Sequence, residues 1–553
     1  MKTPLLLILL IFGVSLHAQD LEQIKLRSPV QFSGSFSANA GLSSISNGLE
    51  DRTSPYFYSL NTRFTLSWNN LRMPFYLALR DHSFNYGATT PRFRFNPRYK
   101  WAELQVGDVF MSFNQYTLAQ RNMRGAAIKL TPGKFRFQAL YGKMQELNSF
   151  RDTLLLGVTD LEVFSNKVLG LGIGFGTNSS HLDLYILKSW TDIDSSDFTN
   201  SILPRQDNVI VGSTGKIRLS RALRVQYNFG LSALTFDRDA IGNSRQIGEN
   251  GLTGSLFDLN NSSGANYAGD VSINYSQGKF GVNGKVTYIQ PFYQPLTVAY
   301  INSDVLNYTV GSYVSLLSNK LYINGSVGIQ QSNVSGVDAF TTNRFIFNLM
   351  TNAKLHKNLT ANLALNNFSQ GLQARLVNIE DLYTYAVTNR LRTLTLTHTL
   401  PSDLRTWTNR LSVGTSSLTT NADNEDVAEG YDMFFARWDG GMKMEPIGLE
   451  INTGVNLQRY DRDGLLNSNY GVTLGASKDL LDEHLILKLN NTFNYLDQGD
   501  FREGTSLISS LSANYKVAEK SNILLTVVRV GRQSVAKTNF SEIRSRLSYQ
   551  QRF

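Results

Sequence analysis

Residues 543–553, the last eleven of the chain, read I-R-S-R-L-S-Y-Q-Q-R-F. The apolar residues of this stretch share one parity: Ile543, Leu547, Tyr549 and Phe553. Its basic residues share the other: Arg544, Arg546 and Arg552. A period of two indicates a β-strand with two unlike faces. Because the apolar face runs to Phe553 with no polar tail behind it, we expect a lipid bilayer around this strand. The alternative is an exposed amphipathic edge strand of a soluble β protein.

This segment resembles the closing strand of bacterial outer-membrane β-barrels, which ends in an aromatic residue with apolar residues at alternating positions before it. Gln551 and Ser545 depart from that pattern. The resemblance implies a porin-like barrel in the outer membrane of a Gram-negative bacterium, with outer-membrane lipid and the barrel-assembly machinery as its partners. It also implies that the barrel-insertion strand presents Ile543, Leu547, Tyr549 and Phe553.

The N-terminal residues predict export. Lys2 precedes an unbroken apolar or small run, residues 5–16, and a small residue, Ala18, offers a cleavage position. This pattern is typical of a secretory signal peptide over residues 1–18. Residues 19–553 are then expected to form a single barrel domain. The chain has no cysteine, which excludes disulfides, thiolate metal sites and cysteine nucleophiles.

Beyond residue 18 no apolar run approaches the ~20 residues of a transmembrane helix. Alternation recurs instead, as where Leu60, Phe64 and Leu66 alternate with Asn61 and Arg63. A closed barrel is the other structure that satisfies every backbone group in lipid, so the sequence predicts an all-β fold, a transmembrane antiparallel β-barrel.

Turn-forming pairs set the predicted strand count. Eleven such pairs are predicted to form the turns of β-hairpins: Asn69-Asn70, Pro132-Gly133, Asn178-Ser179, Ser220-Arg221, Gln277-Gly278, Ser318-Asn319, Lys357-Asn358, Ser402-Asp403, Pro446-Ile447, Asp482-Glu483 and Glu519-Lys520. Longer polar stretches between them, such as 144–163 and 291–305, are expected to be outward loops. Adding a first strand near residues 30–40 and the terminal strand gives twenty-four strands. The sequence leaves two alternatives for residues 101–121: they either add one further pair of strands, making twenty-six, or fold inside the wall.

The same region holds the main anomaly in charge. The whole chain carries a net charge of +9, and residues 92–143 carry ten basic residues against two acidic ones, a net +8. The ten are Arg92, Arg94, Arg98, Lys100, Arg121, Arg124, Lys129, Lys134, Arg136 and Lys143. A positive field in a pore would favour anions. The alternative is that these residues pair with scattered carboxylates, as Asp108 could with Arg121 or Arg124, or contact acidic lipid head groups outside.

Three functions remain open. The first is an outer-membrane pore for passive or weakly anion-selective passage of small solutes, with Arg121, Arg124, Arg136, Arg218, Arg544 and Arg546 as pore-lining basic residues. The second is the barrel component of a protein or polysaccharide export or surface-assembly system with partner proteins. The third is a surface hydrolase, although no catalytic motif supports it. The histidines show no metal-ligand spacing and no phosphate-binding loop is present, so we expect no metal, no cofactor and no nucleic acid.

Overall fold

The computed structural model describes residues 30–46, 55–80, 91–119, 121, 123–144, 165–192, 204–240, 260–374, 385–422, 430–462, 464–499, 501–535 and 539–553. The predicted signal peptide, residues 1–18, lies outside these residues. Within them, no helix is long and apolar enough to cross a membrane. A single-turn 3₁₀ helix, η3 (Glu445–Ile447), connects two of the strands.

Strands make up nearly all of the described chain. The first fourteen are β1 (Gln31–Ile45), β2 (Tyr56–Trp68), β3 (Leu71–Arg80), β4 (Arg92–Phe95), β5 (Arg98–Tyr99), β6 (Ala102–Val109), β7 (Met123–Leu130), β8 (Phe135–Met144), β9 (Ser165–Gly176), β10 (His181–Asp192), β11 (Asp207–Arg218), β12 (Leu223–Thr235), β13 (Ser263–Gln277) and β14 (Phe280–Ile289). The others are β15 (Val305–Leu316), β16 (Leu321–Ser332), β17 (Phe340–His356), β18 (Leu359–Ala374), β19 (Tyr385–Pro401), β20 (Arg405–Ala422), β21 (Tyr431–Met444), β22 (Leu449–Arg462), β23 (Leu465–Leu480), β24 (Leu485–Gln498), β25 (Phe501–Ala518), β26 (Ser521–Ser534) and β27 (Phe540–Arg552).

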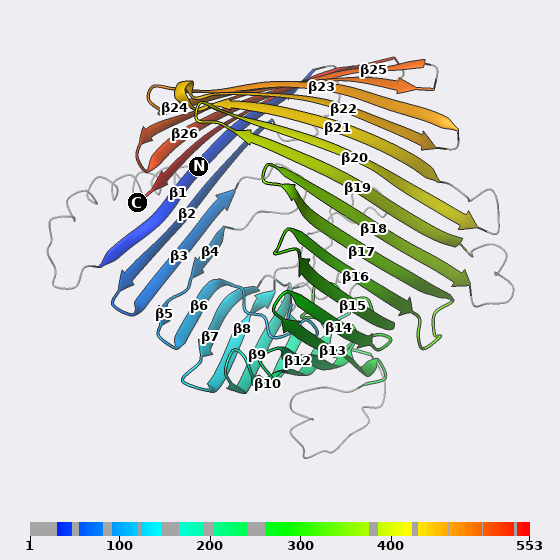
Figure 1. Cartoon of the computed structure of the whole chain (residues 1–553). Helices are drawn as coiled ribbons and strands as arrows, with labels where there is room; N and C mark the ends of the chain where they lie inside the picture. The colour runs from blue at the N-terminus through cyan, green and yellow to red at the C-terminus, as the bar shows by residue number, and fades with distance from the viewer. Residues whose placement is uncertain are drawn as a thin grey trace.

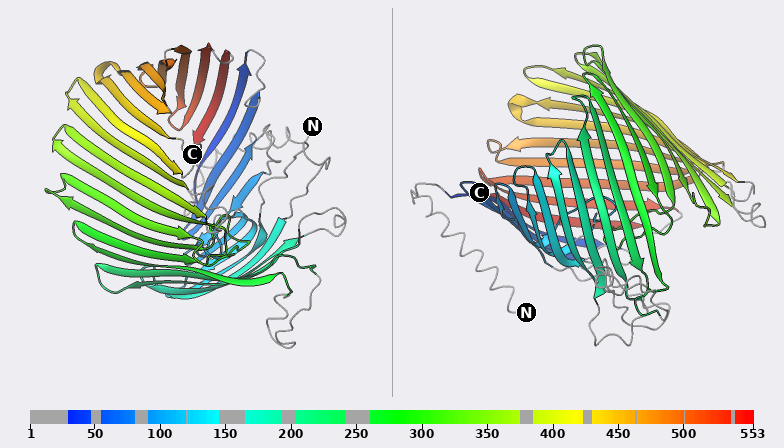
Figure 2. Two further views of the ribbon diagram at one scale, coloured as in Figure 1. Left: turned by 90° about the vertical axis from the view of Figure 1, so that its right-hand side faces the viewer. Right: turned by 90° about the horizontal axis from the view of Figure 1, so that it is seen from below.

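These strands form one closed antiparallel wall. Apart from β4 and β5, each strand pairs with its neighbours in sequence, and β27 pairs with β1, so the ring has no free edge. The blue β1 and the red β27 lie side by side in Figure 1, and Figure 2 shows the tilt of the strands from two further sides. β4 and β5 both pair with β3 and β6, so they are two parts of one wall strand, interrupted at Asn96 and Pro97. The described residues thus build a barrel of 26 strands.

All eleven predicted hairpin turns are confirmed, and a twelfth, at Lys100 and Trp101, brings the count to 26. Lys100 adopts a positive φ of 48°, which a lysine rarely takes. The open question about residues 101–121 has a double answer. Residues 102–109 form β6 in the wall, whereas residues 110–119 leave the wall and fold inward.

The terminal strand closes the barrel as its alternation predicts. Leu547 lies opposite Ala40 of β1 and Leu525 of β26, so its apolar face continues across both neighbours. Phe553 stacks on Phe32 with ring centroids 5.0 Å apart. The backbone N–H of Gly34 donates to the carbonyl oxygen of Phe553 at 2.9 Å, which fixes the last residue to the first strand.

Candidate functional site

Two stretches of chain fold from the long-loop end of the barrel onto its inner face. The first inner segment (residues 110–119) follows β6, and the second inner segment (residues 290–304) follows β14. They pair with each other, because the N–H of Ala119 donates to Thr297 O and the N–H of Ala299 donates to Ala119 O, both at 3.4 Å. The prediction that residues 291–305 form an outward loop is therefore wrong.

Both inner segments bury their central residues against the wall. Tyr116, Thr117, Tyr293 and Thr297 are at most 2% exposed. The Tyr293 hydroxyl donates to the carbonyl oxygen of Tyr116 at 2.6 Å, and the Thr297 hydroxyl donates to that of Thr117. Burial raises the pKa of the Tyr293 phenol, so this hydroxyl stays protonated and keeps its donor role.

Hydrogen bonds between side chains and backbone join the segments to the barrel in both directions. The Asn114 side-chain amide donates to the carbonyl oxygens of Ser213 and Phe229 at 3.2 and 3.0 Å. The backbone N–H of Leu296 donates to Asn208 Oδ1 at 3.1 Å. Because backbone groups that leave a sheet must find such partners when buried, these bonds hold the segments in one place.

Glycines on the inner face make room for the segments. A Cβ at Gly230 would lie 2.5 Å from the Tyr293 hydroxyl and 2.9 Å from Tyr116 Cβ. Gly212, directly opposite Gly230 in the register, faces the Thr117 methyl group just as closely. Glycines at strand positions that face the lumen are therefore the signal in the sequence for a segment that packs on the inner face.

Between the first inner segment and the wall lies a polar pocket of about 280 Å³. Its lining residues include Glu103, Lys129, Arg136, His181, Asp183 and Tyr185 of the wall and Phe110 and Phe113 of the segment. The Arg136 guanidinium is 2.8 Å from the nearly buried Asp183 carboxylate. The Phe113 ring stacks on Tyr185 at 4.6 Å. The pocket is thus built from an ion pair beside an aromatic stack.

The inner wall beside the pocket is strongly basic. Basic side chains that share the inner-face parity from β2 to β8 are Arg63, Arg72, Arg92, Arg94, Arg98, Lys129 and Arg136. Glu103 lies among them, directly opposite Arg98 and Lys129, and forms an ion pair with Arg98 at 3.2 Å. The Arg94 guanidinium lies 3.6 Å from the centre of the Phe110 ring, which ties the segment to this basic surface.

The six basic residues predicted to line a pore do not gather in one place. Arg136 is in the pocket, whereas Arg544 pairs with Glu542, and Arg546 donates to Asn39 Oδ1 at 2.9 Å, both on the inner face of β27. Arg218 hydrogen bonds to the carbonyl oxygens of Ser220 and Arg221 in a short turn, and Arg121 follows the first inner segment.

Arg124 lies elsewhere. It follows Met123, which is buried on the inner face in an apolar cluster with Val109, Leu118 and Leu140, so strand alternation turns the Arg124 side chain to the outer face. The predicted pair with Asp108 is present at 3.8 Å.

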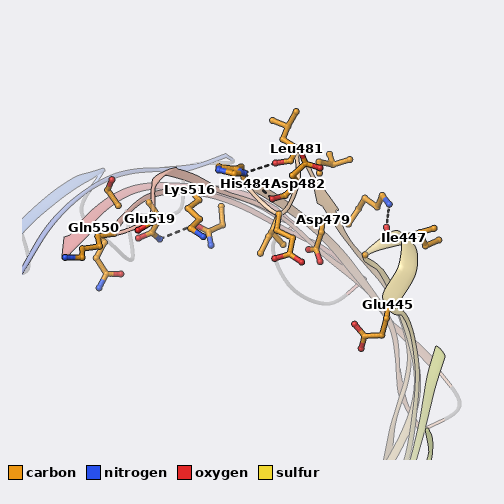
Figure 3. Close-up of a pocket in the computed structure, with 18 of the residues that line it drawn as sticks. Glu445, Ile447, Asp479, Leu481, Asp482, His484, Lys516, Glu519 and Gln550 are labelled. Carbon is orange, nitrogen blue, oxygen red and sulfur yellow. Dashed lines mark hydrogen bonds between the residues drawn. The ribbon is translucent and has the colours of Figure 1, made fainter. Parts of the chain in front are cut away.

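A second hollow, of about 1210 Å³, lies at the short-turn mouth between β21 and β27. Figure 3 shows Glu445, Asp479, His484 and Glu519 around it, contributed by successive turns. The His484 ring is tied to the carbonyl oxygen of Leu481 at 2.9 Å. Five basic and five acidic residues line this hollow, so it carries little net charge: Lys443, Lys478, Lys516, Lys520 and Arg552 against Glu445, Asp479, Asp482, Glu483 and Glu519. The described residues contain no group of three or more His, Asp or Glu side chains placed to hold a metal ion.

The outer face identifies the environment of the barrel. On β9, the outward side chains of Leu169, Leu171 and Ile173 are 43–53% exposed, whereas Val168, which points to the inner face, is fully buried. Large exposed apolar side chains point outward in the same way around the closed wall. Exposing so much apolar surface is unfavourable in water and favourable among lipid tails. The chain is an outer-membrane β-barrel.

No family model matches the barrel sequence, and no curated protein matches it. Solved structures with partial similarity include OccK11 of Pseudomonas aeruginosa, at 8% identity over 95% of this chain and 96% of that one, with a TM-score of 0.30. OccAB2 of Acinetobacter baumannii is 11% identical over 70% of this barrel and 98% of its own chain, with a TM-score of 0.29. The FrpB iron transporter of Neisseria meningitidis is 12% identical over 97% and 83%, with a TM-score of 0.35. Similarity this low carries no conclusion about cargo.

Proposed function

We propose that this barrel is an outer-membrane pore that passes small solutes with a weak preference for anions. The observation that carries the proposal is the basic inner wall from β2 to β8 beside the inner segments. Because low-dielectric walls focus the field of such a cluster, anions are concentrated there and cations are repelled. Of the residues predicted as pore-lining, Arg546 shares the inner-face parity and adds to the same field, whereas Arg136 and Arg544 share the parity but are each paired with a carboxylate, Asp183 and Glu542.

The dimensions of the barrel bear on the size of the solute. A circular ring of 26 strands spaced about 4.8 Å apart and tilted about 40° would measure on the order of 50 Å between opposite backbones. The inner segments cover the wall near β6–β15, so they narrow one side of such a lumen. This width is also the observation that favours the second candidate, a barrel for export or surface assembly of proteins or polysaccharides.

Planar-bilayer recording separates the two candidates. We expect the purified barrel to give open conductance steps and, in a KCl gradient, a reversal potential that indicates anion preference. Arg72→Gln combined with Arg98→Gln should shift the reversal potential toward zero. Lys320→Gln combined with Lys357→Gln, which removes two charges from short turns, is the matched control and should leave it unchanged. A closed wild-type barrel would refute the pore and favour the export candidate.

A further inference from the structure

Three alternate glycines leave the inner face of β9 bare beside the first inner segment. Gly170, Gly172 and Gly174 lie at inward-facing positions of this strand. A Cβ at Gly170 would lie 3.1 Å from the Phe113 ring, and one at Gly172 would lie 2.8 Å from the Tyr185 ring. The glycine-rich run of β9 therefore makes room for aromatic side chains of the segment and of β10.

The same glycines open the floor of the polar pocket between the first inner segment and the wall. In the register Gly174 lies between Arg136 of β8 and Asp183 of β10. A Cβ at Gly174 would overlap the Asp183 carboxylate, so the glycine lets the Arg136 guanidinium reach that carboxylate across the strand, at 2.8 Å. The pocket is thus a designed feature of the wall and not a packing defect.

The charges that line the pocket balance one another. Its basic and acidic side chains are equal in number, Lys129 and Arg136 against Glu103 and Asp183, so with His181 neutral the lining carries no net charge. Arg136 is paired with Asp183, and Glu103 is paired with Arg98 at 3.2 Å. A polar ligand without net charge therefore suits this lining.

Two polar side chains of the pocket lack a partner in the described chain. Gln138 is 8% exposed and Lys129 is half-buried, and neither side chain has a hydrogen bond or an ion pair within the residues that the structure describes. They lie directly opposite each other on β8 and β7, so their Cβ atoms are about 5 Å apart. Because a polar side chain as buried as Gln138 is nearly always hydrogen bonded, the pocket that both residues line is where the missing partner belongs.

Glu103, Lys129 and Gln138 form one row across β6, β7 and β8 with complementary hydrogen-bonding capacity. The Lys129 ammonium only donates and the Gln138 amide both donates and accepts. Glu103 accepts through Oε1 from Arg98 and Gln105, which leaves Oε2 as a further acceptor. Since a hydroxyl group accepts one hydrogen bond and donates another, adjacent hydroxyl groups of one molecule can join all three side chains.

We propose that this pocket binds a single neutral sugar ring. Its volume of about 280 Å³ lies just below the ~300–1,000 Å³ of ordinary small-molecule sites, so it suits one hexose-sized molecule and not an oligosaccharide. Met111 and Phe113 line the same pocket and offer apolar contact to the carbon atoms of the ring. Two further lining residues, Phe110 and Ser112, are exposed, so the pocket is open to solvent. The site does not depend on the proposed pore, because binding requires only the pocket.

The test titrates the full-length barrel in detergent with D-glucose and, separately, with D-gluconate, which carries a carboxylate beside similar hydroxyl groups. We expect saturable binding of glucose. Lys129→Met combined with Gln138→Leu, which removes the polar atoms at nearly constant size, should weaken it by roughly tenfold to a hundredfold. The matched control, Lys488→Met combined with Gln330→Leu, removes the same side chains from β24 and β16, where neither lines the pocket, and should bind glucose as the wild type does.

Each outcome decides the proposal. A wild-type barrel that does not bind glucose overturns it, and so does wild-type affinity in the double variant or an equal loss in the control. Gluconate binding more than about tenfold tighter than glucose would show an anion site instead and overturn it as well. If the double variant fails to fold, Lys129→Met alone should lose roughly tenfold, and unchanged affinity there refutes the site. Because the titration measures no current, a closed barrel that binds glucose would refute the pore and support the sugar site.

Discussion

A valine at Gly230 should release the inner segments from the wall. Its Cβ would stand 2.5 Å from the Tyr293 hydroxyl, where ordinary contacts begin near 3.4 Å. The second inner segment must therefore move by about 1 Å to admit Cβ alone, and the two methyl groups of valine add to the overlap. Tyr116 of the first inner segment, 2.9 Å from the same position, is displaced as well.

The free-energy cost of this substitution is comparable with the free energy of the hydrogen bonds that attach the segments to the wall. Moving Tyr293 by about 1 Å stretches its 2.6 Å hydrogen bond to Tyr116 O beyond bonding range and leaves buried polar groups unpaired, at about 1–3 kcal/mol. Overpacking adds about 1–3 kcal/mol. Opposing this, the two hydrogen bonds from Asn114 contribute about 1 kcal/mol each, and the 2.5 Å bond from Gln115 to the Asp270 carboxylate contributes about 1.5–3 kcal/mol.

The assay is single-channel conductance in a planar bilayer. Gly230→Val should raise the conductance and its noise, because the segments leave the inner face for part of the time. Gly441→Val is the matched control, since a Cβ there meets nothing nearer than Thr408 O at 4.0 Å. Unchanged conductance in a folded Gly230→Val barrel would refute the view that the segments narrow the pore, and so would an equal rise in the control.

Three further changes test the barrel and its charges. Phe553→Glu should reduce assembly, seen as loss of the heat-modifiable band on gels, whereas Arg552→Gln on the opposite face should not; normal yield of Phe553→Glu argues against an insertion role. Arg546→Glu should lower anion preference in reversal-potential measurements without loss of barrel, and an unchanged potential removes Arg546 from the pore. The Arg205 hydrogen bonds lower the pKa of Asp239, so their pairing persists above the ordinary aspartate pKa and is lost only as pH falls through the lowered value. The NMR signal of the Arg205 side chain should report this loss at acid pH in the wild type but not in Asp239→Asn, and a signal that titrates alike in both refutes the pairing.

The wall could be predicted closely because its determinants are local. Alternation and turn chemistry act over a few residues, and ten of the eleven predicted turns contain a residue that favours a turn by itself, the exception being Glu519-Lys520. The missed turn at Lys100 contains none of them and depends on a lysine with positive φ. Its conformation is set by the pairing of β5 with β6 and not by its own preference.

The inner segments could not be predicted because their determinants are distant in sequence. Residues 290–304 carry no strand alternation or turn pair that places them, and their partners, Asn208 and Tyr116, precede them by up to 177 residues. The inner-facing glycines were visible in the sequence, but Gly212 and Gly230 acquire meaning only once the register shows that they face each other under the same segments. Long-range packing decided the site, whereas local pattern decided the wall.

The basic stretch shows why charge alone did not decide between lumen and lipid: alternation sends it to both. Arg94, Arg98, Lys129 and Arg136 turn inward, whereas Arg124 and Lys143 turn outward. Asp108 lies 3.8 Å from Arg124 on the outer face, while the same two strands turn Glu103 and Lys129 inward, so one run of alternating residues supplies charge to both faces of the wall.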